Sequence, residues 1–105
     1  MSILTKLERE LETKLVSKIQ ALDGKCLKWT SPGTTGLPDR IVLLPEGRIA
    51  FVELKRPKGS RVGALQRYWR IVLKRLGFLH WWVYTEADID ALIEHMAEHE
   101  RVGKS

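Results

Sequence analysis

The chain has 105 residues, with 18 Lys or Arg and 13 Asp or Glu, so its formal net charge is +5. This length favours a single domain over residues 1–105 with one modest core, and no stretch approaches the roughly 20 apolar residues of a membrane span. The single cysteine, Cys26, excludes an internal disulfide and predicts a buried small side chain in a reducing, cytoplasmic setting.

Hydrophobic periodicity predicts an α/β domain with element order α-β-β-β-α-β-α. Apolar residues spaced three and four apart indicate helices, and short apolar runs bounded by turn residues indicate strands. A helix between two strands permits parallel pairing, which predicts a mixed sheet flanked by helices. The predicted elements are a helix over 3–22, a strand over 25–29, a loop over 30–38, a hairpin of strands 40–44 and 49–54, a helix over 62–76, a strand over 79–84 and a last helix capped by Thr85.

All three helices have a predicted apolar stripe. For the helix over 3–22 it consists of Leu4, Leu7, Leu11, Leu15, Ile19 and Leu22. For the helix over 62–76 it consists of Leu65, Trp69, Val72 and Leu76. For the last helix it consists of Ile89, Leu92, Ile93 and Met96.

The middle of the chain is strongly basic. Between Leu54 and Thr85 there is no Asp or Glu. A contiguous basic block of this kind indicates a polyanionic partner such as nucleic acid, and the alternative is a solvated basic face. The basic residues of the block are Lys55, Arg56, Lys58, Arg61, Arg67, Arg70, Lys74 and Arg75.

The hairpin gathers chemically active side chains. Asp39 precedes its first strand, and folding at the turn brings Asp39 back toward the end of the second strand. Alternation along that strand places Glu53 and Lys55 on the same face. Taken singly, Asp39 could be a turn residue and Glu53 the ion-pair partner of Lys55. Together they indicate a site at one end of a small sheet.

The first helix offers another carboxylate. On a helical wheel Glu8 and Glu12 fall inside the apolar arc, whereas Glu10 points toward solvent. A carboxylate on a buried face is costly unless it is paired or binds a metal. Either glutamate could meet a lysine or arginine at the edge of the core.

These residue types suit metal-assisted phosphodiester hydrolysis. Carboxylate oxygens are the ligands that Mg²⁺ and Mn²⁺ prefer. A bound metal polarises a phosphate and lowers the pKa of an attacking water, and a nearby lysine can stabilise the developing negative charge. The sequence therefore predicts a nuclease with Asp39, Glu53 and Lys55 in its site.

The pattern resembles the PD-(D/E)XK nucleases and, within them, the VRR-NUC family. The similar segments are Lys28-Trp29-Thr30-Ser31-Pro32-Gly33, Gly36-Leu37-Pro38-Asp39-Arg40, Phe51-Val52-Glu53-Leu54-Lys55 and Leu65-Gln66. The Val-Arg-Arg triplet that names the family is absent as such.

The resemblance implies a restriction-endonuclease-like fold and a role for each matching residue. Asp39, Glu53 and the Leu54 carbonyl would bind Mg²⁺ or Mn²⁺. The first-helix metal ligand would be Glu12, with Glu8 as the alternative. Lys55 would be the catalytic lysine, and Gln66 would support the site or touch the DNA backbone. We assign DNA contacts to Lys28, Arg56, Lys58, Arg61, Arg67 and Arg70.

The resemblance also implies a substrate and an assembly. The similar proteins are the small stand-alone members of the family, of phage or bacterial origin. Similarity to them implies a homodimer that cuts four-way (Holliday) DNA junctions. His80, Trp82 and Tyr84 share one face of the strand over 79–84, which makes this aromatic row a candidate dimer interface, unless helices cover both faces. The alternative function is a non-catalytic DNA-binding module on a nuclease-like scaffold.

Overall fold

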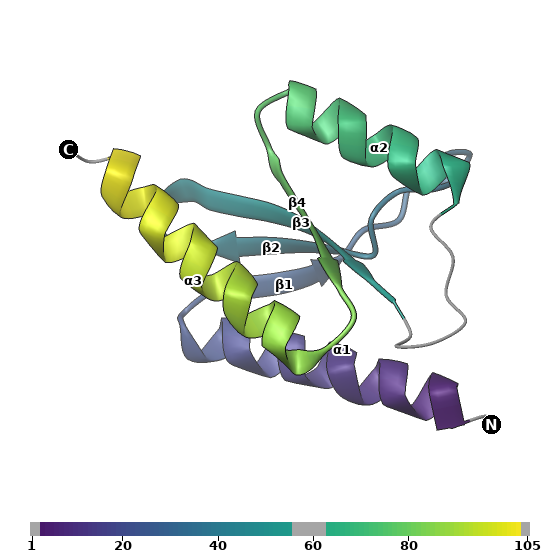
Figure 1. Cartoon of the computed structure of the whole chain (residues 1–105), viewed down its shortest axis with the longest axis horizontal. Coiled ribbons are helices and arrows are strands. Elements are labelled where there is room, and N and C mark those ends of the chain that lie inside the picture. The colour runs from purple at the N-terminus through teal and green to yellow at the C-terminus, as the bar shows by residue number, and fades with distance from the viewer. Residues whose placement is uncertain (1–2, 56–62, 104–105) are drawn as a thin grey trace.

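The structure, a computed structural model, describes residues 3–55 and 63–103 (Figure 1). It has the predicted element order, and most boundaries fall within two residues of those predicted. Val62, where the second helix was expected to begin, lies outside the described residues. The elements are α1 (Ile3–Ala21), β1 (Lys25–Lys28), β2 (Arg40–Leu44), a 3₁₀ turn (Pro45–Gly47), β3 (Arg48–Leu54), α2 (Ala64–Arg75), β4 (Leu79–Val83) and α3 (Glu86–Gly103).

The four strands form one mixed sheet in the order β1-β2-β3-β4. The first three strands are antiparallel, and β4 runs parallel to β3 because α2 carries the chain back between them. Arg40 is opposite Val52 in the β2–β3 register, which places Asp39 beside Glu53 at the end of the hairpin. The mixed α/β architecture predicted from the sequence is therefore confirmed.

The main core lies between one face of the sheet and the helices α1 and α3. Side chains of even-numbered residues on β2 and β3, such as Val42 and Val52, point into this core. Leu15 and Ile19 of α1 meet them, and Cys26 is buried there as predicted. The buried face of α3 is also confirmed, with Ile89, Leu92 and Met96 buried and Ile93 packed at the edge.

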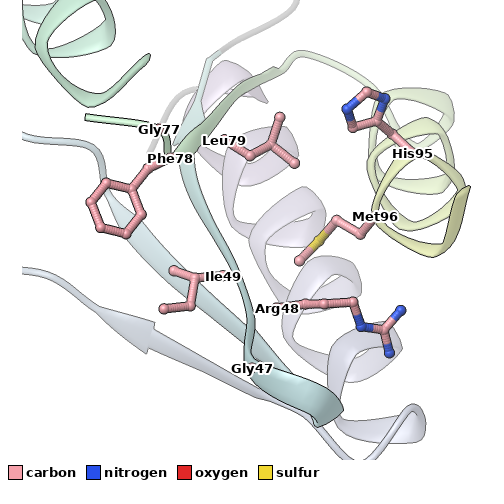
Figure 2. Close-up of a pocket in the computed structure, with 8 residues that line it drawn as sticks. All are labelled: Gly47, Arg48, Ile49, Gly77, Phe78, Leu79, His95 and Met96. Atoms are coloured by element: carbon pink, nitrogen blue, oxygen red, sulfur yellow. The ribbon is translucent and has the colours of Figure 1, made fainter. Parts of the chain in front are cut away.

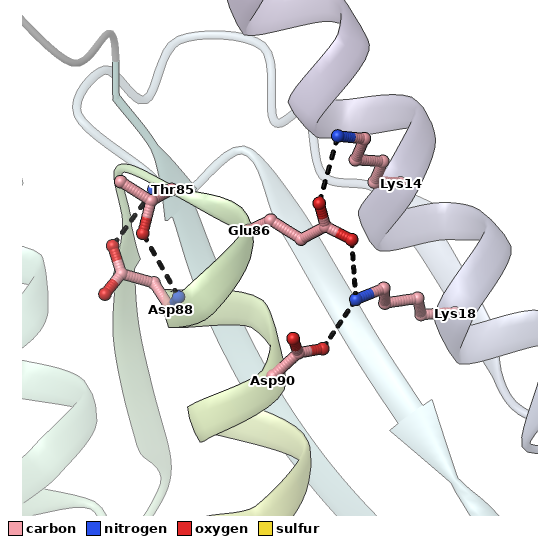
Figure 3. A network of polar contacts seen from close by, with 6 residues as sticks. All are labelled: Lys14, Lys18, Thr85, Glu86, Asp88 and Asp90. Carbon is pink, nitrogen blue, oxygen red and sulfur yellow. Dashed lines mark hydrogen bonds and ion pairs between the residues drawn. The ribbon is translucent and has the colours of Figure 1, made fainter.

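A polar network joins α1 to the start of α3 (Figure 3). Glu86 bonds Lys14 at 3.0 Å and Lys18 at 2.9 Å, and Lys18 also reaches Asp90 at 2.6 Å. The Asp88 N–H donates to the Thr85 hydroxyl at 3.3 Å, so Thr85 caps the helix as predicted. The network links α1 to the start of α3, although exposed ion pairs of this kind add little stability.

The predicted stripe of α2 is wrong in detail. Leu73 is the buried apolar residue of this helix, whereas Leu65 and Leu76 are 51% and 67% exposed. At about 100° per residue, the observed face is turned by roughly 80° from the predicted one, toward Gln66. α2 packs on the sheet face opposite the main core, chiefly against β4, and a helix over one edge strand buries only a narrow line of residues.

Helices cover both faces of β4. His80, on the α2 side, is only 7% exposed, and Trp82 packs against it with ring centres 4.8 Å apart. Burial and the nearby positive charge of Arg70 lower the pKa of His80 to about 4. His80 is thus covered within one chain, whereas Trp82 and Tyr84 are half-buried, and the role of this row as a dimer interface stays a prediction. Among the described residues, no helix is both long and apolar enough to cross a membrane.

Candidate active site

Asp39 and Glu53 come together at the end of the hairpin, as the spacing predicted. The Leu54 amide donates a hydrogen bond to Asp39 Oδ2 at 2.8 Å, which ties the residue before β2 to the last residue of β3. Glu53 is 4% exposed, whereas Asp39 keeps an exposed surface. The strand pairing of the hairpin and the Leu54 N–H therefore position the two carboxylates next to each other.

Gln66 connects three parts of the site. Its Nε2 donates to Glu53 Oε1 at 2.7 Å, and its Oε1 accepts from Lys55 Nζ at 2.6 Å. The same Oε1 accepts the Gly63 amide at 3.0 Å, just before α2 begins. Lys55 is 8% exposed and its Nζ lies 6.0 Å from the centre of the Trp82 ring. The amide of Gln66 thus holds a buried ammonium beside a buried carboxylate.

Glu12 is bonded to Arg40, for which the sequence predicted no role. Arg40 Nε and Nη2 each lie 3.0 Å from Glu12 Oε2, and Arg40 Nη1 donates to the Cys26 carbonyl at 3.1 Å. The signal was present in the sequence. Strand alternation puts Arg40 on the same face as Val42, toward α1, where a carboxylate on the apolar arc needs a cation.

The acids influence one another's protonation. Burial, and then the charge of Asp39, raise the pKa of Glu53 to about 8, and the charge of Glu8 adds to this shift. Burial also raises the pKa of Asp39, and the charge of Glu12 raises it further. The hydrogen bond from the Leu54 N–H acts the other way and lowers it. Two carboxylates that repel each other in a partly desolvated site form a donor set that fits a hard divalent cation.

A pocket of about 280 Å³ opens over Asp39, and Glu8, Glu12, Lys28, Trp29 and Leu54 are among the residues that line it. Within residues 3–55 and 63–103, no three carboxylate, His or Cys side chains are already grouped as metal ligands. Asp39 and Glu53 are brought together, while Glu12 is turned to Arg40. The assignment of Glu12 or Glu8 as a further ligand stays a prediction, as does that of the Leu54 carbonyl.

A second hollow, of about 320 Å³, lies at the other end of the sheet (Figure 2). Ile49, Phe78, Leu79 and Met96 give it an apolar lining, and Arg48 and His95 lie at its edge. Its lining holds no carboxylate, so it lacks the groups that the predicted chemistry needs. The pocket over Asp39 is therefore the candidate active site.

The predicted DNA-contacting residues fall into two groups. Lys28 lines the pocket over Asp39. Arg67 and Arg70 lie on α2, where Arg67 is exposed and Arg70 is half-buried. Arg56, Lys58 and Arg61 lie outside the described residues. The assignment of all six to DNA stays a prediction.

A mixed sheet whose hairpin ends in Asp39, Glu53 and Lys55 defines a domain of the PD-(D/E)XK class. A solved structure described as a VRR_NUC domain matches with a TM-score of 0.78 and 30% sequence identity, covering 84% of this chain and 95% of that one. The chain therefore belongs to the VRR-NUC family, which confirms the resemblance.

A phage protein is also similar in sequence. "Putative nuclease p44" of Acyrthosiphon pisum secondary endosymbiont phage 1 is 48% identical over 50 residues, which are 48% of this chain and 54% of that protein. The aligned part thus spans about half the length of that relative. No family model matches the sequence.

Proposed function

We propose that this protein is a Mg²⁺- or Mn²⁺-dependent endonuclease that hydrolyses phosphodiester bonds in branched DNA such as four-way junctions. The observation that carries the proposal is the pairing of Asp39 with Glu53 beside the Lys55 ammonium. Family membership and the phage relative support a nuclease activity. The basic residues of α2 and Lys28 supply positive charge for a phosphate backbone.

Asp39 and Glu53 would hold the metal, with the Leu54 carbonyl and Glu12 or Glu8 completing its ligands. A bound divalent ion would polarise the scissile phosphate and lower the pKa of a water. Lys55 would donate a hydrogen bond to the reacting oxygens, because Gln66 keeps its ammonium next to Glu53. Gln66 thus acts as a positioning residue for both groups.

We further propose that two copies of the chain act together, because a junction has two strands to cut. The exposed apolar residues of the sheet support this proposal. Leu27, Ile49 and Phe78 are 48%, 38% and 40% exposed, and they lie around Phe51 on the face beside α2. An apolar surface of this kind favours a protein partner over bulk water.

The test is cleavage of end-labelled duplex, single strand, flap and four-way junction in Mg²⁺, Mn²⁺ or EDTA. We expect metal-dependent cutting with preference for the junction, and sedimentation of the same sample as a dimer. The Glu12–Arg40 pair is the observation that favours the alternative, a DNA-binding module without catalysis. Tight junction binding without cutting in either metal would establish that alternative, and full activity in EDTA would refute the metal chemistry.

A further inference from the structure

A third hollow adjoins the pocket over Asp39. It has a volume of about 320 Å³ and is formed by the loop between β1 and β2. Trp29, Thr30 and Leu37 line both hollows, so the two lie side by side. Ser31, Pro32 and Gly36 complete much of the lining of this third hollow, which we call the loop hollow. It therefore combines an aromatic ring, apolar surface and hydroxyl groups next to the proposed phosphate site.

Trp29 stands at the boundary between the two hollows. Its ring packs on Phe51 with centres 5.0 Å apart, and the side chain remains only half-buried. Its backbone amide donates to the Asp39 carbonyl at 3.1 Å. The backbone of Trp29 is thus tied to that of a proposed metal ligand, and Trp29 and Asp39 line the same pocket.

The loop is held in this shape before any ligand binds. A Cβ on Gly36, whose φ is +84°, would lie 2.5 Å from Leu65 Cβ, so loop and helix approach each other closely. The Trp69 indole donates to the Thr35 carbonyl at 3.1 Å. The Thr34 amide donates to the Ser31 carbonyl at 3.1 Å, which closes a turn. Trp69 is therefore used to anchor the loop, which leaves Trp29 as the ring that faces the hollows.

We propose that the loop hollow binds one unstacked nucleobase next to the scissile phosphate, with Trp29 as its stacking surface. This proposal rests on the proposed nuclease function. A base inside a continuous duplex already has neighbours on both faces and cannot enter. A base at a branch point is free to leave the stack, so the hollow selects branched or open DNA over duplex.

The test compares a side-chain change with a base deletion. Wild type, Trp29→Leu and Trp29→Phe are assayed on junctions that carry either a normal or an abasic nucleotide at each position flanking the cut. Stacking predicts that Trp29→Leu slows cleavage of the normal substrate roughly tenfold. When the abasic position is the one whose base would enter the loop hollow, Trp29→Leu and wild type should cut at the same reduced rate. Trp29→Phe should retain most activity on normal DNA.

Equal slowing by Trp29→Leu on normal and abasic substrates would overturn the proposal, because a merely structural role of Trp29 acts on both. Thermal unfolding of each variant controls for misfolding, and Trp29→Phe keeps the packing on Phe51.

A binding measurement separates this proposal from the nuclease assignment. 2-Aminopurine at the same positions is measured in EDTA, where no cutting occurs. Quenching with wild type but not with Trp29→Leu supports the base site even if no substrate is ever cleaved. Unchanged fluorescence with wild-type protein at saturating concentration would refute it even if cleavage is fast.

Discussion

Replacing Lys55 with methionine is expected to slow junction cleavage by about 10²- to 10³-fold at saturating metal, the usual loss when one donor to a developing oxyanion is removed. Methionine has nearly the length of lysine, so the buried space stays filled. The Gly63 amide continues to hold the Gln66 oxygen that Lys55 now shares. Removing one partner of a buried charge pair is costly when the other charge stays behind, but the pKa of Glu53 is raised to about 8. Without Lys55 this carboxyl is protonated near neutral pH, so no uncompensated buried charge remains and the fold should survive.

The matched control is Lys25→Met, since Lys25 is exposed on β1 at the end far from the site. It removes the same charge and should leave the cleavage rate unchanged. Rates are measured under single-turnover conditions, with circular dichroism to verify the fold. If Lys55→Met cleaves as fast as Lys25→Met, the lysine has no part in the chemistry.

Gly36→Ala is expected to destabilise the protein by about 2–4 kcal/mol and to lower cleavage as well. About 1 kcal/mol comes from placing an L-residue at a positive φ, and the rest comes from forcing atoms apart where the loop meets Leu65. Because the same loop leads into Asp39, relief of the overlap moves a proposed metal ligand. The measurement is the urea unfolding midpoint together with the single-turnover rate.

Gly33 provides a control in the same loop. Its φ is +82°, close to that of Gly36, but nothing lies within 4 Å of the position of an added Cβ. Gly33→Ala should therefore cost only the conformational strain of about 1 kcal/mol. Equal unfolding midpoints for the two alanine variants would show that the contact between loop and α2 is not tight.

The hairpin could be predicted almost completely from the sequence. Its strands, its turn and the approach of Asp39 to Glu53 follow from alternation and from the length of the connection. The parallel pairing of β4 followed from the helix before it. These features depend on local pattern and chain connectivity, which a single sequence contains.

Features that depend on how elements pack were harder to predict. The apolar spacing of α2 gave a stripe through Leu65 and Leu76, but the helix is turned so that Gln66 reaches Glu53. The role of Gln66 came from family resemblance alone. The helical wheel predicted that Glu12 or Glu8 would meet a cation or a metal, but the bond between Arg40 and Glu12 joins residues 28 positions apart, so its partner could not be named from local pattern.

The proposed hydrolysis requires Asp39 and Glu53 to hold a divalent ion beside Lys55. The most direct measurement is a crystal structure of the protein soaked in Mn²⁺, with anomalous diffraction to locate the metal. We expect a peak about 2.2 Å from an oxygen of each carboxylate, with the Lys55 ammonium next to it, and no peak in a crystal of Asp39→Asn treated identically. A fully occupied Mn²⁺ elsewhere on the molecule, with Asp39 and Glu53 empty, would contradict the account.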